Sequence, residues 1–455
     1  MATDTREIHR KLLWMVGVAL ALRLVTMAYV YPLQLVPDRG GEHWPFGYET
    51  GKIAASIAEG HGFSNPLFAP TGPTAWMTPV YPYFMAGVFK VFGVYSTASA
   101  LVMLTFNALT SALTCLPIFF FARRSFGAPL GERAGEWAGW IWALFPYAIY
   151  WPVDRIWDTW LATLLLAILF CMALRLAETN RARDWIAFGA LSGFAALTDP
   201  VVLSVLPFLA LWALWRLHRL RVRWFPSAIG CALATIIVIS PWVVRNYRVF
   251  HKFIPLRDNF ALALRVGNIG DTRHMLTLEA GPWLNENEWR LYQRVGEIVY
   301  MRYARDAALD YISAHPREYV DSCVRRAVYF WTHFWPLPPK LLAGFEPNPG
   351  DVFLITTLTI LALLGLRDAF RKKSHGAGAY AIVLLLFPAV YYATSLEPWY
   401  RVPMDPMVIA LAAYAITSRL DSRAALQHTA NLTDVRDDSS ETEAYSRVSS
   451  TSQVA

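Results

Sequence analysis

The sequence predicts an all-α polytopic membrane protein, and three observations support this prediction. The 455 residues are 55% hydrophobic and only 16% charged, whereas an ordinary soluble domain carries about 25% charged residues. The mean hydropathy of the chain is +0.32. Its apolar stretches are continuous rather than alternating, which favours helices over a transmembrane barrel. A cytosolic enzyme, a disordered protein and a small secreted domain are therefore excluded.

About ten segments are apolar and long enough to cross a bilayer, where a helix needs about 20 mostly apolar residues. In chain order they are 12–32, 98–122, 134–152, 157–176, 185–199, 201–216, 225–243, 351–367, 378–394 and 404–419. The first of these segments lacks a small-residue cleavage site, so we expect a membrane anchor rather than a cleaved signal peptide.

Basic residues near the ends of these spans predict the orientation of the protein, because Lys and Arg accumulate on the cytoplasmic side. All the main clusters fall on one side when the amino terminus is cytoplasmic. They are Arg6, Arg10 and Lys11; Arg123, Arg124 and Arg133; Arg181 and Arg183; Arg216, Arg219, Arg221 and Arg223; and Arg367, Arg371, Lys372 and Lys373. The net charge of +7 therefore indicates membrane topology, and we expect no nucleic-acid partner.

This topology divides the chain into four parts. They are an N-terminal transmembrane module (1–243) that contains a first outer loop (33–97), an extracytoplasmic segment (244–350), C-terminal transmembrane helices (351–419) and a tail (420–455). Within the extracytoplasmic segment, residues 286–325 have the pattern of an amphipathic helix. The tail is rich in Ser, Thr and Asp without apolar periodicity, so we expect a disordered cytoplasmic segment.

Acidic residues gather at the predicted outer face, while the middle of the membrane is almost free of charge. Ionisable residues in such places are functional candidates. Asp154 and Asp158 are spaced i, i+4 at the turn between the third and fourth spans, which predicts that they share one helical face. In the first outer loop, Tyr48–Glu59 has helical periodicity, and Glu49 lies in the first turn, where the helix dipole favours a carboxylate. Helix capping is the alternative interpretation of Glu49.

Arginines follow the same outer face. Arg245 lies in the basic, aromatic stretch SPWVVRNYRVFHKFIPLRDNF, and Arg401 lies in EPWYRVPMDP before the last span. A guanidinium group offers two parallel donors to a phosphate. The alternative is that these residues anchor the helices at the membrane interface. The four cysteines have no CxxC or Cys/His spacing, so neither a structural zinc site nor a disulfide framework is predicted.

Several motifs occur in a characteristic order and on one side of the membrane. An acidic first outer loop leads to a helix ending in AEGHGF, followed by GPTAWMTPVYPYFMAGVFKVFG, later by SPWVVRNYRVF, and finally by PWYRVPMDP. Together they resemble the bacterial membrane glycosyltransferases of the C-type fold, a group that includes relatives of the protein O-mannosyltransferases and of the aminoarabinose transferases. The resemblance covers about residues 30–420.

The resemblance implies an enzyme of the bacterial inner membrane whose active site faces the periplasm. Such enzymes move a sugar from a polyprenyl-phosphate donor to a lipid, glycan or protein acceptor, and they invert the anomeric carbon. An acid of the first outer loop acts as the general base, and basic residues at the outer face hold the phosphate. Besides the donor and the acceptor, we expect membrane lipids to be partners. The resemblance identifies no definite cofactor.

The resemblance also implies roles for individual residues. Glu49 best matches the first-loop acid, with Asp38 and Glu42 as alternatives, and Asp158 matches the acid after the third span. Tyr400 and Arg401 match the family's Tyr-Arg-x-Pro run. Where aminoarabinose transferases carry Lys before a Pro-Pro pair, this chain has Thr78-Pro79-Val80. The phosphate contacts are therefore expected from Lys52, Arg245 or Arg401, and aminoarabinose transfer to lipid A is disfavoured.

Three questions stay open at the level of sequence. A lipid or polysaccharide transporter or flippase is an alternative to the transferase, as is a non-catalytic protein of envelope assembly. A transporter predicts polar residues along a path through the bilayer, which this sequence lacks. The scattered acids do not define the oxygen-ligand geometry of a hard cation, but a divalent ion near Asp158 stays an alternative.

Overall fold

The computed structural model describes residues 5–34, 46–270, 277–335 and 348–421, and within these ranges it is built of helices. The β pairing in the described ranges is a single bridge between Ser64 and Pro73. The predicted all-α fold class is therefore confirmed. The candidate residues Asp38 and Glu42, and the tail from residue 422 onward, lie outside the described residues.

The helices follow one another as α1 (Thr5–Gln34), α2 (Glu49–Ala58), α3 (Val80–Phe92), α4 (Thr97–Leu113), α5 (Cys115–Phe126), α6 (Leu130–Leu144), α7 (Pro146–Asp154), α8 (Thr159–Leu176), α9 (Ala182–Thr198), η2 (Pro200–Ser204), α10 (Leu206–Arg219), α11 (Phe225–Phe250), α12 (Phe260–Asn268), η4 (Leu278–Ala280), α13 (Glu286–Val295), α14 (Glu297–Ala314), α15 (Pro316–Thr332), α16 (Pro349–Arg371), α17 (Ala377–Leu386), α18 (Ala389–Ala393) and η5 (Pro398–Met404). A last helix covers residues 405–421.

Each predicted span corresponds to helix in the structure. Six stretches are long and apolar enough to cross a membrane among the described residues, namely Arg6–Tyr31, Thr97–Phe126, Thr159–Leu176, Pro200–Arg219, Phe225–Phe250 and Pro349–Arg371. The other predicted spans are shorter or interrupted helices. Prolines explain two interruptions, since Pro146 starts α7 and Pro388 precedes α18, and proline cannot donate to the preceding helical turn. The protein is a multi-pass membrane protein, and the count of ten spans stays a prediction.

Two helical predictions at the outer face are wrong. Asp154 and Asp158 do not share a helical face, because α7 ends at Asp154 and Arg155 takes an extended conformation before α8 begins at Thr159. The expected single amphipathic helix over 286–325 is divided into α13, α14 and α15. Gly296 separates α13 from α14 with a φ of +77°, a conformation that glycine adopts without steric cost.

The turns that carry the basic clusters lie together at one end of the bundle, here called the basic end. Lys11 of α1 bonds Glu136 of α6 at 2.8 Å. Glu178, after α8, bonds both Arg124 of α5 at 2.6 Å and His375, before α17, at 3.3 Å. These contacts place Lys11 and Arg124, which belong to two of the predicted basic clusters, at this end of the molecule, while the membrane side of the clusters stays a prediction.

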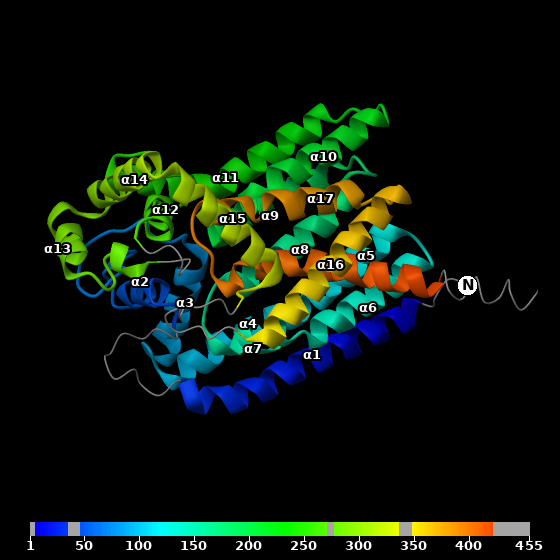
Figure 1. Cartoon of the computed structure of the whole chain (residues 1–455), viewed down its shortest axis with the longest axis horizontal. Helices are drawn as coiled ribbons and strands as arrows, with labels where there is room; N and C mark the ends of the chain where they lie inside the picture. The colour runs from blue at the N-terminus through cyan, green and yellow to red at the C-terminus, as the bar shows by residue number, and fades with distance from the viewer. Residues whose placement is uncertain (1–4, 35–45, 271–276, 336–347, 422–455) are drawn as a thin grey trace, which may run out of the picture.

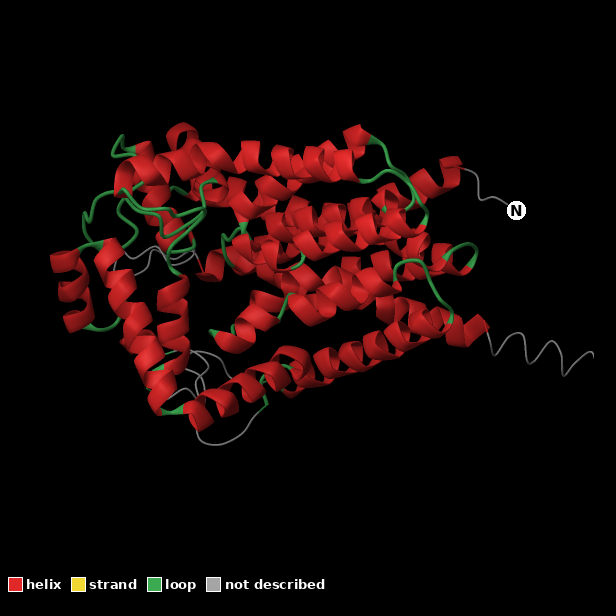
Figure 2. Cartoon of the chain, turned by 90° about the horizontal axis from the view of Figure 1, so that it is seen from above, coloured by secondary structure: helices red, strands yellow, loops and turns green. Residues whose placement is uncertain are grey.

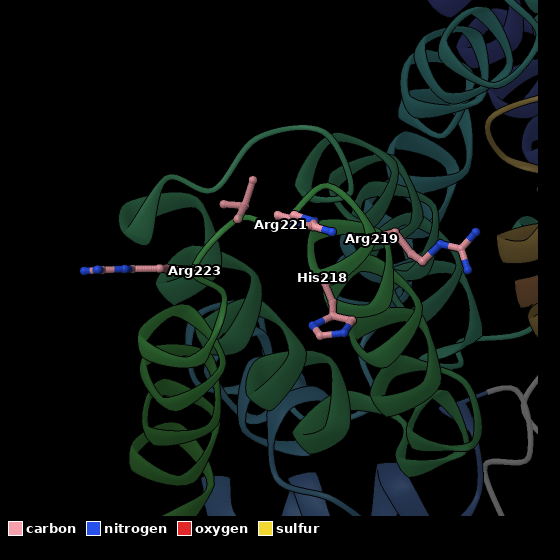
Figure 3. A pocket seen from close by; sticks show the side chains of 5 residues that line it. His218, Arg219, Arg221 and Arg223 are labelled. Carbon is pink, nitrogen blue, oxygen red and sulfur yellow. The ribbon is translucent and has the colours of Figure 1, made fainter.

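At the basic end, a cavity of about 460 Å³ opens at the turn between α10 and α11. It is lined by His218, Arg219, Arg221, Val222 and Arg223. Figure 3 shows that the side chains of Arg219 and Arg223 point away from each other. Their guanidinium groups therefore do not converge on one ligand, and the cavity is a basic surface rather than a closed binding site.

The opposite end, here called the site end, carries the short helices. Figure 1 shows α2, α3 and α12 to α14 gathered beyond the ends of the long helices, far from the amino terminus. Figure 2 shows the long helices running side by side toward the basic end. The last helix, 405–421, is almost entirely buried among them. The bundle therefore forms a rigid base on which loops and short helices of the site end can be positioned.

Candidate active site at the site end

Glu49 begins α2 and is held by a residue far away in the sequence. Its Oε1 accepts a hydrogen bond of 2.9 Å from the indole Nε1 of Trp283. Burial raises the pKa of Glu49, although the N–H groups of its own turn, Trp283 and Lys52 act in the opposite direction. A carboxylate with a raised pKa is a better proton acceptor near neutral pH. Glu49 is therefore an oriented, partly buried base candidate.

Gly47 brings the start of α2 against the loop that carries Asp158. A Cβ atom at Gly47 would lie 2.6 Å from the carbonyl oxygen of Ile156 and 2.6 Å from Cδ1 of Trp157. Gly47 also has a φ of +70°, which an L side chain rarely adopts. Only glycine permits this approach, and the approach places Glu49 close to the 155–158 loop.

Asp158 precedes the membrane-spanning helix α8 and faces a second carboxylate. Burial, reinforced by Asp199, raises the pKa of Asp158 to about 7, while Arg257 opposes the shift. Asp199 itself caps η2, and its Oδ1 accepts the backbone N–H of Val201 at 3.1 Å. Two acids from different loops therefore lie close enough to act on each other's charge, at the start of α8 and the end of α9.

Aromatic residues join this acidic loop to η5. The rings of Trp157 and Trp399 lie 4.4 Å apart, and the Arg155 guanidinium lies 5.2 Å from the ring of Trp399. Glu397 lies in the same region, and its burial raises its pKa to about 7 although Arg155 opposes the shift. This packing brings the segment 397–400 against the loop of Asp158.

Tyr400 enters the site from η5 and stacks on Tyr391 of α18 with ring centroids 4.7 Å apart. Burial raises the pKa of Tyr400, and Glu397, Arg257 and Glu49 lie close enough to act on its charge. Tyr391 in turn faces Asp199, Arg257 and Asp158. Tyr400 therefore connects the Glu49 side of the site with the Asp158 side.

Arg257 lies in the connection between α11 and α12. It acts electrostatically on Asp158, Tyr391 and Tyr400. Within the described ranges, its guanidinium group has no hydrogen bond and no carboxylate within 4.0 Å. Its donors therefore remain available for an anionic ligand.

Arg245 has a different environment. Its guanidinium donates to the carbonyl oxygens of Thr74 at 2.7 Å and Phe63 at 2.8 Å. It also lies over the ring of Trp242, at 4.9 Å from the centroid. The donors of Arg245 thus hold the connection between α2 and α3, and its predicted contact with phosphate stays a prediction.

Arg401 turns toward the bundle rather than toward Tyr400. Its Nε pairs with Oδ1 of Asp405 at 2.7 Å, and its Nη1 donates to the carbonyl of Phe330 at 3.2 Å. Arg401 is 5% exposed and Asp405 is 1% exposed, so this is a buried ion pair. The arrangement ties η5 to α15, and a phosphate contact by Arg401 stays a prediction.

Lys52 lies one turn after Glu49 on α2 and acts on its charge. Its ammonium group lies 5.2 Å from the ring centroid of Tyr48. The structure thus brings together four of the sequence candidates: Glu49, Lys52, Asp158 and Tyr400. Arg245 and Arg401 instead hold neighbouring parts of the structure, through backbone carbonyls and through Asp405.

Asp199 and Arg257 also belong to the site, although no sequence motif identifies either residue. Asp199 precedes Pro200 at a helix turn, and Arg257 lies in the aromatic, basic stretch after α11. Their positions at the predicted outer face are the signal that the sequence offers. In the part of the chain that the structure describes, no three His, Cys, Asp or Glu side chains form a group that could hold a metal ion. A divalent ion at Asp158 stays a prediction.

A comparison with protein families finds a match over part of the chain. Residues 75–244 match the family described as dolichyl-phosphate-mannose-protein mannosyltransferase. The predicted resemblance to membrane glycosyltransferases is confirmed. The matched residues run from the connection before α3 to α11, so they include Asp158 and Asp199 but not Glu49, Arg257 or Tyr400. No curated protein sequence matches the chain significantly.

Solved structures with a distant likeness include two kinds of protein. The archaeal oligosaccharyltransferase AglB from Archaeoglobus fulgidus, in complex with an inhibitory peptide and a dolichol-phosphate, has 14% identity and a TM-score of 0.48, over 91% of this chain and 52% of that chain. ArnT from Cupriavidus metallidurans bound to undecaprenyl phosphate has 14% identity and a TM-score of 0.34, over 93% and 80%. The present chain thus spans about half the length of the archaeal protein.

Proposed function

We propose that the protein is a membrane glycosyltransferase that moves a sugar from a polyprenyl-phosphate donor to an acceptor hydroxyl. The observation that carries the proposal is the meeting of Glu49, Asp158 and Arg257 at one end of a helix bundle. The family match over residues 75–244 supports the same reaction class. Because a lipid, a glycan or a protein can each supply the required hydroxyl group, the proposal covers all three kinds of acceptor.

In the proposed reaction, Glu49 is the general base. Its carboxylate takes the proton of the acceptor hydroxyl as the acceptor oxygen attacks the anomeric carbon of the sugar. The bond between that carbon and the phosphate oxygen breaks, and the lipid phosphate leaves with the bonding electrons. Attack from the side opposite the leaving group inverts the anomeric carbon. Trp283 holds the Glu49 carboxylate by its hydrogen bond of 2.9 Å.

We assign the departing phosphate to Arg257, assisted by Lys52 and Tyr400. A preorganised cation stabilises the charge that develops on a leaving group. Arg257 has uncommitted donors among the described residues, whereas the donors of Arg245 and Arg401 hold backbone carbonyls and Asp405. Asp158 and Asp199 act on each other's charge beside Arg257, and they are suited to hydrogen-bond the sugar hydroxyls.

The proposed location is the bacterial inner membrane, with the site end in the periplasm. The basic end then faces the cytoplasm, as the distribution of Lys and Arg predicts. A polyprenyl chain needs an apolar environment beside the phosphate site, which accounts for an active site at the membrane boundary. The long helices next to the site end supply that environment.

The test is sugar transfer in proteoliposomes supplied with radiolabelled undecaprenyl-phosphate mannose and a pool of membrane lipids, glycans and peptides as acceptors. Glu49→Gln should lower the transfer rate by about 100- to 10,000-fold, the contribution of a general base. Glu59→Gln is the matched control, since Glu59 is an exposed acid at the other end of α2. Normal transfer by Glu49→Gln would refute the role of Glu49. Donor movement across the bilayer without transfer would favour a flippase.

A further inference from the structure

A buried pair of carboxyl groups lies behind the candidate site. Glu297, the first residue of α14, is 8% exposed. Asp258 follows Arg257 directly, and among the described residues neither of its buried carboxyl oxygens accepts a hydrogen bond. The two acids act strongly on each other. Nothing in the proposed reaction uses either group, so the pair requires a separate explanation.

Burial raises the pKa of Glu297, but its carboxyl group also accepts hydrogen bonds from three donors, which favour the ionised form. Its Oε1 accepts the backbone N–H of Ala75 at 2.6 Å, and its Oε2 accepts the hydroxyl groups of Thr74 at 2.5 Å and Tyr292 at 3.1 Å. A carboxylate with three such donors favours its charged form. Burial and Glu297 raise the pKa of Asp258, so we assign the proton of the pair to Asp258, which can donate it to Glu297. One proton shared by two buried carboxyl groups avoids two adjacent negative charges.

This pair holds the peptide that leads to Glu49. The indole of Trp76, next to Ala75, is 1% exposed and packs edge-on against Trp283 at 5.8 Å. Trp283 is the residue that donates to Glu49. Movement of Thr74 and Ala75 would therefore move Trp76, then Trp283, and finally the base. Glu297 therefore influences the position of Glu49 indirectly, through Trp76 and Trp283.

The same pair holds the peptide that carries Arg257. The backbone N–H of Asp258 donates to the carbonyl oxygen of Ala75 at 3.1 Å. Asp258 is thereby fixed through its main chain to the residue that Glu297 binds. Because Arg257 is the preceding residue, its guanidinium depends on the same anchor.

We propose that the Asp258–Glu297 carboxyl pair, sharing one proton, is a positioning device for the general base and the phosphate-binding arginine of the proposed site. The inference rests on the proposed function for the roles of Glu49 and Arg257. Both residues depend on one peptide, residues 74–75, that is held between α14 and the connection after α11. A single buried contact thus sets the distance between the two reactive groups.

The charge of this contact depends on pH. Burial and the neighbouring Glu297 hold the pKa of Asp258 well above its ordinary value. Other groups that face the pair are Arg245 from α11, which acts electrostatically with Glu297, and Tyr292 from α13. When Asp258 ionises at high pH, two buried carboxylates repel each other, and the 74–75 peptide should be released.

Two substitutions separate the roles of the pair. Glu297→Gln places an amide NH₂ where acceptor oxygens are needed, so amide hydrogen exchange in the 71–78 segment should become faster. This variant should also lower kcat/KM by about 100-fold, which is the effect of a small misplacement of reacting groups. Asp258→Asn keeps a neutral donor toward Glu297 but cannot ionise. It should retain slow exchange at high pH, where the unsubstituted protein loses it.

The measurement is hydrogen exchange of the 71–78 segment by mass spectrometry between about pH 6 and pH 10, corrected for the intrinsic pH dependence, together with sugar transfer. Glu286→Gln, at an exposed acid of α13, is the control and should change neither. Equal exchange in the unsubstituted protein and Asp258→Asn at every pH would overturn the proposal. If Glu297→Gln does not fold, the Asp258→Asn comparison still decides. If the unsubstituted protein transfers no sugar, the proposed function fails, while the exchange data still test the anchor.

Discussion

At the scale of single residues, the structure distinguishes arginines that the sequence treats alike. Arg245, Arg257 and Arg401 all lie in basic or aromatic stretches at the predicted outer face. Arg245 donates to backbone carbonyls and Arg401 pairs with a buried aspartate, whereas the described contacts leave the donors of Arg257 uncommitted. A guanidinium that is held by backbone carbonyls or by a buried carboxylate fixes the fold, and one without such partners can bind a ligand.

This distinction predicts opposite effects for two substitutions. Arg401→Gln leaves Asp405 buried without its cation, which costs about 3–5 kcal/mol in comparable buried pairs. The variant should therefore unfold at a lower temperature in detergent. Arg257→Gln should keep the thermal stability of the unsubstituted protein and raise KM for the polyprenyl-phosphate donor. A stability loss for Arg257→Gln, with an unchanged KM, would contradict the assignment.

The raised pKa of Asp158 predicts a pH dependence of transfer. Burial beside Asp199 places this pKa at about 7. If the ionised form holds the substrate, activity rises as the pH increases through about 7, and Asp158→Asn abolishes this rise. Initial rates between about pH 5 and pH 9 provide the measurement. Glu397 has a pKa raised to a similar value, so Glu397→Gln is the matched comparison, and a rise lost only in that variant would assign the titration to Glu397.

At the scale of elements, the sequence predicts helices well and their meeting points poorly. Continuous apolar runs define the long helices, because each run must satisfy its backbone hydrogen bonds within the membrane. The i, i+4 spacing of Asp154 and Asp158 does not predict their arrangement. Ile156 is fully buried, and Arg155 lies over the ring of Trp399. These two contacts hold the intervening residues out of the helix. The hydrogen bond from Trp283 to Glu49 joins residues 234 positions apart, and such contacts have no local signal.

The approach of α2 to the 155–158 loop gives a prediction at this scale. Gly47→Ala places a methyl group 2.6 Å from the carbonyl oxygen of Ile156, and it also strains a φ of +70°. The start of α2 should shift, and sugar transfer should fall by about 100-fold or more. Gly60→Ala is the control, because Gly60 has a φ of +91° but nothing within 4 Å of an added Cβ. Equal activity losses in both variants would assign the effect to backbone strain alone.

At the scale of the whole molecule, charge and chemistry separate along the helix axes. The basic turns form one end, and the acids of the candidate site and Arg257 belong to the other, where Figure 1 shows α2 and α12. The sequence predicts this separation from the positions of Lys and Arg alone, because those positions follow the helix ends. The cluster of carboxylates could not be predicted from the sequence, because its members come from α2, the start of α8, the end of α9 and η5.

The two ends should lie on opposite sides of the membrane. The 26 residues of α11 span about 39 Å at 1.5 Å per residue, which exceeds the roughly 30 Å of the hydrocarbon core. Arg221 precedes this helix and Lys252 follows it, and both are exposed. A membrane-impermeant maleimide should therefore label Lys252→Cys in intact spheroplasts and Arg221→Cys only after permeabilisation, with the unsubstituted chain and its four native cysteines as background. Labelling of Arg221→Cys alone in intact cells would invert the topology and place the candidate site in the cytoplasm, where the proposed periplasmic reaction could not occur.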